Sequence, residues 1–218
     1  MIYDGPLPSA SRRDSRTEHK HRLRKHLHPQ LRELWKQQPD LREQGEDFFA
    51  EFTTPLNMLS DPGPGVHQIV RSKRNDLHGK KGLDYIADAH QTCGGRFVPL
   101  VRKSSGFTCK LDVLFLRRDN LGNLIQSGGD IDNRIKVLFD GLKMPQIKAD
   151  LGGFLIAEDE NPFFCLLEDD SLITSLSVTA DRLLTPQTGT GHCIHDVLLV
   201  IRVTVVNESA LFADGRIV

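Results

Sequence analysis

The sequence is poor in the features that mark secreted and membrane-embedded proteins. Its four cysteines are too scattered to form a disulfide framework in a chain of 218 residues. The longest aliphatic run, Val197 to Ile201, is far too short to span a bilayer. The first residues contain neither a basic segment nor an apolar one, so we expect no signal peptide. These absences predict a protein of the reducing cytoplasm that has no membrane partner.

The residues that are present suffice for a compact fold. Hydrophobic residues make up 39% of the chain and charged residues 26%, and there are 11 phenylalanines, so a largely disordered chain is excluded. The net charge is only −1, but it hides an alternation along the chain. Residues 1–36 carry +5, residues 37–70 carry −5, residues 71–118 carry +7 and residues 119–218 carry −8. This pattern fits an ordinary solvated surface, or an anionic ligand held by basic segments over a carboxylate-rich site.

The N-terminal half has one well-marked element. A short strand is expected over residues 1–3, and helical spacing predicts a helix from about residue 17, with a break or kink near His28 because Pro29 lies inside the pattern. Four histidines of this segment are expected on the polar face of that helix: His19, His21, His26 and His28. A second helix is expected after Asp40, with Phe48, Phe49 and Phe52 among its apolar residues.

The C-terminal half predicts strands around one helix. Residues 96–103 and 107–117 are expected to form a hairpin, and residues 130–143 a helix. Residues 197–206 predict a central strand and residues 172–178 a weaker one. We therefore expect an α/β (α+β) fold, in which a mixed β-sheet packs with helices.

The helix over residues 130–143 carries the most informative polar groups. Asp130 stands at the N-cap position after two glycines, where the backbone can turn sharply. Asp132, Lys136 and Asp140 follow at intervals of four residues and so share one face. An N-cap with a surface ion pair is one interpretation. The other is a site that holds Mg²⁺ against a phosphate, since Mg²⁺ prefers carboxylate oxygens.

A second group of acids, Glu168-Asp169-Asp170, lies between apolar segments. Three crowded carboxylates repel one another, and a divalent cation relieves that repulsion. Taken alone the group predicts only a negatively charged loop. Together with the helix it favours a metal site.

These segments resemble the signature of RusA-type Holliday junction resolvases. The similarity is carried by Asp130-Ile131-Asp132-Asn133, by Lys136, by Asp140-Gly141-Leu142 and by Asp169-Asp170-Ser171-Leu172-Ile173. The opening Gly5-Pro6-Leu7-Pro8 also resembles the first strand of the family and the proline turn after it. The match covers residues 96–206 and the N-terminus.

The resemblance implies a homodimeric α/β endodeoxyribonuclease of phages and prophage-bearing bacteria. Such an enzyme cleaves four-way DNA junctions during recombination and repair, with Mg²⁺ or Mn²⁺ as cofactor. It also implies that Asp130, Asp132 and Asp170 are the essential acids and the metal ligands, with Asp169 or Glu168 in support, and that Lys136 assists them. The chain is then expected to be a single RusA-like domain over residues 1–218, with insertions at residues 37–93 and 144–167. The acids Glu158-Asp159-Glu160 fall in the second insertion, and a surface role is expected for them.

Basic residues in two segments are expected to hold DNA phosphates without sequence preference. They are Arg12, Arg13, Arg16, Lys20, Arg22, Arg24, Lys25, Arg71, Lys73, Arg74, Lys80 and Lys81. A solvated helix face is the alternative for these residues. Two further functions stay open: a catalytically silent nucleic-acid-binding protein with a RusA-like fold, and an interaction module that uses residues 37–93. Zinc is also conceivable, bound by His90 and Cys93 with the cluster at residues 192–195, although the spacing is not that of a typical structural site.

Overall fold

The structure is a computed structural model that describes residues 1–8, 13–38, 41, 82–117, 130–184 and 196–207. The side chains of residues 13–16 and of Asp130 lie outside this description, although their backbones are helical. The helix expected after Asp40 also lies outside the described residues. Within them the fold is mixed α/β, as the sequence predicts, and contains two mixed sheets and three α-helices.

The larger sheet has four strands in the order β1-β7-β4-β6. Its strands are β1 (Ile2–Pro6), β4 (Phe107–Arg117), β6 (Ile173–Arg182) and β7 (Asp196–Asn207). β7 is antiparallel to both β1 and β4, whereas β6 runs parallel to β4 at the edge. The predicted central strand is thus confirmed as β7, and the weaker one as β6.

The smaller sheet has three strands in the order β2-β3-β5. They are β2 (Gln91–Thr92), β3 (Gly95–Val101) and β5 (Phe163–Leu167), and β3 and β5 are parallel. The predicted hairpin between β3 and β4 is wrong, because the two strands belong to different sheets. Both strands exist, but the short 3₁₀ helix η1 (Lys103–Ser105) between them redirects the chain from one sheet to the other.

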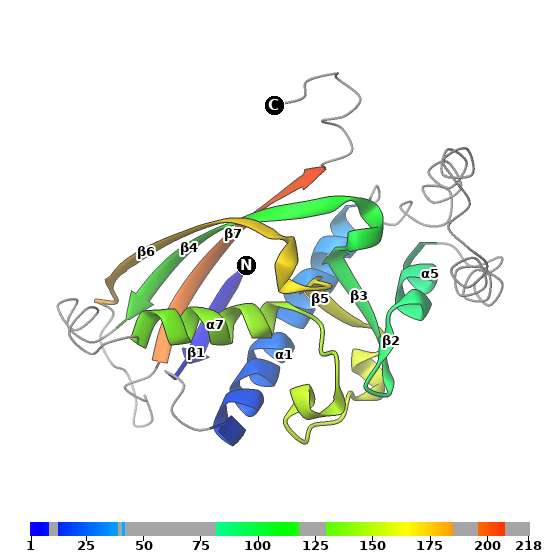
Figure 1. Cartoon of the computed structure of the whole chain (residues 1–218), viewed down its shortest axis with the longest axis horizontal. Coiled ribbons are helices and arrows are strands. Elements are labelled where there is room, and N and C mark those ends of the chain that lie inside the picture. The colour runs from blue at the N-terminus through cyan, green and yellow to red at the C-terminus, as the bar shows by residue number, and fades with distance from the viewer. Residues whose placement is uncertain (9–12, 39–40, 42–81, 118–129, 185–195, 208–218) are drawn as a thin grey trace, which may run out of the picture.

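Three α-helices pack on these sheets in the described part of the chain: α1 (Arg13–Gln37), α5 (Gly82–Ala89) and α7 (Asp130–Leu142). α1 and α7 lie together on one side of the four-stranded sheet, while α5 lies beside β2 and β3 (Figure 1). α7 starts and ends where its apolar spacing predicts. None of the described helices combines the length and apolar character needed to cross a membrane.

α1 continues through Pro29, so of the predicted break or kink a break is excluded. A proline inside a helix removes one hydrogen bond and costs roughly 3 kcal/mol. Here Leu27 and Leu31 on either side of it are 2% exposed, and this packing offsets the cost. The histidine prediction is also wrong for His21 and His28, which are 1% and 4% exposed and therefore point into the protein.

The core lies between the helices and one face of the large sheet. Along β4 the side chains alternate strictly, with Leu111, Val113 and Phe115 buried and Lys110 and Asp112 exposed. All five residues of β5 are buried as well. The end of the segment expected to be an insertion at residues 144–167 is therefore part of the core, and its buried strand positions Glu168, Asp169 and Asp170 directly after it.

Candidate functional site

The polar groups of the predicted site lie at two ends of one helix. The apolar face of α7 fixes it in the core through Ile135, Leu138 and Leu142, which are 8%, 0% and 1% exposed. Its N-terminal end carries Asp130 and Asp132, and Asp140 lies eight residues further, about 12 Å along the axis of an α-helix. The helix is thus a rigid support that carries carboxylates near both of its ends.

At the N-terminal end, Asp132 and Lys136 form an ion pair. The Nζ atom of Lys136 is 2.6 Å from Oδ2 of Asp132, and both side chains are about two-thirds exposed. An exposed pair at this spacing contributes only about 0.3–0.5 kcal/mol to stability. The structure brings these two predicted residues together and leaves both accessible to a substrate from solvent.

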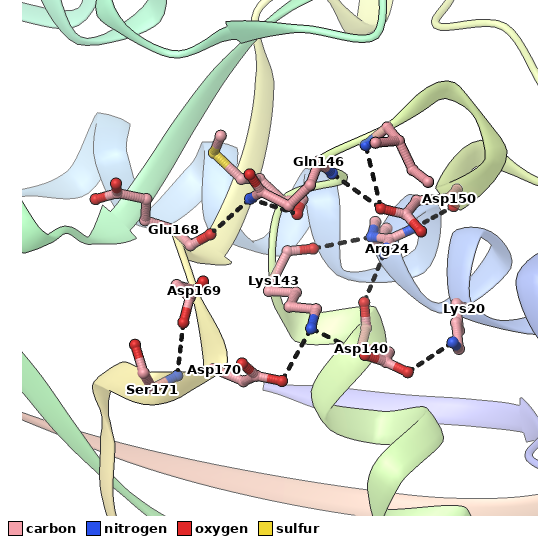
Figure 2. Close-up of polar contacts among 12 residues, drawn as sticks. Lys20, Arg24, Asp140, Lys143, Gln146, Asp150, Glu168, Asp169, Asp170 and Ser171 are labelled. Atoms are coloured by element: carbon pink, nitrogen blue, oxygen red, sulfur yellow. Dashed lines mark hydrogen bonds and ion pairs between the residues drawn. The ribbon is translucent and has the colours of Figure 1, made fainter.

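At the other end of α7, an ammonium group joins two carboxylates. Lys143 Nζ lies 3.0 Å from Oδ1 of Asp140 and 2.9 Å from Oδ2 of Asp170 (Figure 2). Lys20 of α1 contributes a second cation, 2.6 Å from Oδ2 of Asp140. Partial burial alone would raise the pKa of Asp140, but the hydrogen bonds and charges of Lys20 and Lys143 outweigh it and lower that pKa. Asp140 is therefore held as a carboxylate.

Asp170 begins the short 3₁₀ helix η4 (Asp170–Leu172), and Asp169 caps it. The carboxylate of Asp169 accepts a hydrogen bond of 2.9 Å from the backbone N–H of Ser171, and this contact lowers the pKa of Asp169. Lys103 lies 3.8 Å from the same carboxylate. The structure thus gives Asp169 a capping role, while Asp170 contacts the ammonium group of Lys143.

Glu168 is held more firmly than either aspartate. Its Oε2 accepts a hydrogen bond of 2.8 Å from the backbone N–H of Lys103 and lies 3.8 Å from Nε2 of His90. The contact with His90 is the largest influence that lowers the pKa of Glu168, and partial burial opposes it. The other ring nitrogen of His90 is 2.8 Å from the carbonyl oxygen of Ile86, so this nitrogen carries the proton and donates it.

These contacts arise because β3 and β5 are parallel. Their carboxyl ends meet at one edge of the small sheet, which places Lys103 beside Glu168 and Asp169. No role was predicted for Lys143 or Lys103 from the sequence, and His90 was considered only as a zinc ligand. For Lys143, the i, i+3 spacing from Asp140 at a helix end was a usable signal. For Lys103 and His90 there was none, since strand pairing is not encoded by local spacing.

Only some of the basic side chains that are predicted to contact DNA are exposed to solvent. Arg24 is 3% exposed, and its guanidinium donates to the backbone oxygens of Asp140, Lys143 and Asp150 at 2.6, 2.9 and 2.8 Å. The expectation that Arg24 contacts DNA is therefore wrong, because the side chain is enclosed and its donors are occupied by the protein's own backbone. Burial also lowers the pKa of Arg24.

The other basic residues of α1 face outward or lie outside the description. Arg22 pairs with Glu18 at 2.7 Å, and Lys25 pairs with Glu160 at 3.0 Å. Glu160 ends the 3₁₀ helix η3 (Glu158–Glu160), where its largely covered side chain is neutralised by Lys25 while Glu158 and Asp159 are exposed. No side-chain description exists for Arg13 and Arg16. The remaining predicted contacts lie outside the described residues: Arg12, Arg71, Lys73, Arg74, Lys80 and Lys81.

The acids fit a hydrated Mg²⁺ site better than a closed cage of protein ligands. Mg²⁺ is commonly held by one or two carboxylates, while waters and substrate phosphates complete its shell. Asp140 and Asp170, which share one ammonium group, have this character. Among the described residues, no group of three or more histidine, cysteine, aspartate or glutamate side chains could hold a metal ion. The side chain of Asp130, the first predicted ligand, is not among them.

The two described residues of the alternative zinc site, His90 and Cys93, give no support to zinc binding. His90 already contacts the Ile86 carbonyl and Glu168, and Cys93 Sγ lies 3.8 Å from the backbone oxygen of Pro145. Residues 192–195 lie outside the described residues.

Comparisons of the chain with protein-family models, curated proteins and solved structures found no match. The resemblance to RusA-type resolvases therefore depends on the quoted motif residues.

Proposed function

We propose that this protein is a metal-dependent endodeoxyribonuclease of the RusA type that cleaves four-way DNA junctions. The observation that carries the proposal is the exposed Asp132–Lys136 pair on a helix whose opposite face is locked in the core. A nuclease needs such an arrangement, because the carboxylate and the ammonium group must keep their positions while a phosphodiester approaches.

The chemistry assigns a different task to each group. Mg²⁺ or Mn²⁺ ions, held by Asp130 and Asp132 at the start of α7 and by Asp170 beyond its other end, would neutralise the charge of the pentacovalent phosphate and lower the pKa of a bound water. Lys136 lies one turn after Asp132, where its ammonium group can donate to a non-bridging phosphate oxygen. Exposed cations on α1, such as Arg22 and Lys25, would add contacts to the phosphate backbone that carry no sequence preference.

A catalytically silent DNA-binding protein with the same fold is the second candidate function. It is favoured by the ion pairs that already neutralise Asp132 and Asp170. The two candidates make different predictions for substitutions of the acids. A silent protein loses no activity when these acids are removed, whereas an enzyme loses its turnover and retains most of its affinity for DNA.

Two single substitutions test the assignment of the third ligand under saturating Mn²⁺. Asp170→Ala is expected to remove nearly all cleavage, because it deletes a ligand that follows a buried strand. Asp159→Ala is the matched control and is expected to retain activity, since Asp159 is exposed on η3. The opposite ranking would contradict the assignment of Asp170 and would place the third ligand at residues 158–160.

A further inference from the structure

Lys143 lies directly after the C-terminal end of α7. Among the described cations at that end, it is the one that contacts a predicted metal ligand, Asp170. Its ammonium group lies within 3.0 Å of both Asp140 and Asp170, and its side chain is 22% exposed. Partial burial alone would lower the pKa of Lys143, but the hydrogen bonds that it donates to Asp170 and Asp140 outweigh the burial and raise that pKa. The group is therefore a permanent cation between two carboxylates.

The backbone of Lys143 is fixed from three directions. Its N–H donates to the carbonyl of Phe139, its own carbonyl accepts from Arg24, and it forms a parallel bridge with Leu167 at the end of β5. The bridge brings the end of α7 to the strand that leads into Asp170, and Figure 2 shows the ammonium group between the two acids. The fold therefore sets the position of the backbone from which the ammonium group of Lys143 extends.

We propose that Lys143 is a positioning residue that neutralises Asp140 and Asp170 in the metal-free protein and competes with the divalent cation for Asp170. This inference rests on the proposed function in one respect, since it takes Asp170 as a ligand of that cation. Two carboxylates that share one ammonium group would otherwise repel each other. An incoming cation meets the like charge of Lys143 and must displace it from Oδ2 of Asp170.

The Asp132–Lys136 pair does not have this geometry. Both of its side chains are about two-thirds exposed, and Lys136 pairs with Asp132. Solvent screens such a pair strongly, so its competition with a cation is weak. Lys143 is more enclosed and has two partners, and this makes it the stronger competitor.

Calorimetric titration of Mn²⁺ into the full-length protein without DNA tests the proposal. Lys143→Gln is expected to bind Mn²⁺ with a Kd roughly three- to tenfold lower than the unsubstituted protein, because no ammonium group has to leave. Lys143→Arg keeps the charge and is expected to keep the original Kd. Lys148→Gln, which removes an exposed lysine of the 3₁₀ helix η2 (Lys148–Leu151), is the matched control and should change little.

The outcomes separate this inference from the proposed function. An equal or higher Kd for Lys143→Gln, with Mn²⁺ bound by every variant, overturns the inference and leaves the nuclease proposal in place. No Mn²⁺ binding by any variant overturns both. A lower Kd for Lys143→Gln without cleavage of any DNA supports the inference and contradicts the nuclease. Cooperative melting in EDTA checks that each variant folds. Asp170→Asn gives an independent test, because unchanged Mn²⁺ affinity there would also overturn the inference.

Discussion

Arg24 connects α1 with the end of α7 through a single buried side chain. Its three hydrogen bonds go to the backbone oxygens of Asp140, Lys143 and Asp150, and the first two belong to the last turn of α7 and the residue after it. Carbonyls at a helix C-terminus lack partners inside the helix, and a cation there also interacts favourably with the helix dipole. Arg24 therefore supports the backbone from which Asp140 and Lys143 project.

We predict that Arg24→Met lowers the free energy of unfolding by about 2–5 kcal/mol, because it leaves buried carbonyls without a charged donor. Urea denaturation at pH 7 measures this change. Arg22→Met is the control: Arg22 is about half exposed and pairs with Glu18, so its loss should cost at most about 0.5 kcal/mol. Equal effects of the two substitutions would contradict the structural role of Arg24.

His21 is a second buried polar residue of α1, and its ring stacks on Phe154 and Phe163. Burial and then the charges of Arg24 and Lys25 lower its pKa from the ordinary value of 6.5 to about 4, against the opposing charge of Glu160. The unfolded chain therefore binds more protons than the folded one between pH 6.5 and 4. The stability that depends on neutral His21 is complete above pH 6.5 and is lost as the pH falls toward 4.

We accordingly expect the urea midpoint of the protein to fall between pH 7 and pH 4.5, and His21→Phe to reduce that fall. The phenyl ring keeps the stacking contacts and has no proton to bind. A smaller fall should persist in the variant, since burial also lowers the pKa of His28. An identical pH dependence in both proteins would show that His21 is not the titrating group.

Arg24 and His21 also show what sequence periodicity misses at this scale. With His28, Leu31 and Trp35 they form a buried stripe at spacings of three and four residues, all between 1% and 4% exposed. The leucines alone predicted the helix correctly. Three members of the stripe are polar, so a pattern based on apolar residues placed them on the outer face.

At the scale of elements, α1 and α7 approach closely at Gly141. A Cβ atom added there would collide with the side chain of Leu23. Alanine would favour the helix by up to about 1 kcal/mol over glycine, but overpacking of a core usually costs about 1–3 kcal/mol. The close contact matters for the site, because Gly141 lies between Asp140 and Lys143 in the chain.

We predict that Gly141→Ala destabilises the protein by about 1–2 kcal/mol, and that the cost becomes smaller in a Leu23→Ala background, where space is available. Thermal or urea unfolding of the four proteins in this double-mutant cycle measures the coupling. Strict additivity of the two substitutions would mean that the helices do not meet at this point.

The elements themselves were largely predictable, whereas their partners were not. The β-branched run of β7 and the apolar stripe of α7 were sufficient to place both. The turn at residues 104–106 correctly separated β3 from β4, but a turn signal does not state whether the flanking strands pair. The meeting of Lys143 with Asp170 depends on the parallel bridge between Lys143 and Leu167 at the end of β5, and so it could not be derived from spacing.

At the scale of the whole molecule, the proposed function requires two nicks placed symmetrically on a junction. Twofold symmetry supplies two equivalent sites, so we predict a homodimer. Light scattering at micromolar concentration should give about twice the chain mass of 24.5 kDa. A strictly monomeric protein that still resolves junctions would contradict this prediction.

The most direct test of the central claim is cleavage of a synthetic four-way junction in the presence of Mg²⁺ or Mn²⁺, with linear duplex and flap DNA as controls. The account predicts that the protein nicks the junction in preference to both controls. It also predicts that Asp132→Asn slows cleavage by at least about a hundredfold, while folding and junction binding are retained. Undiminished cleavage by Asp132→Asn, or no cleavage by the unsubstituted protein while it binds the junction and the metal, would contradict the account.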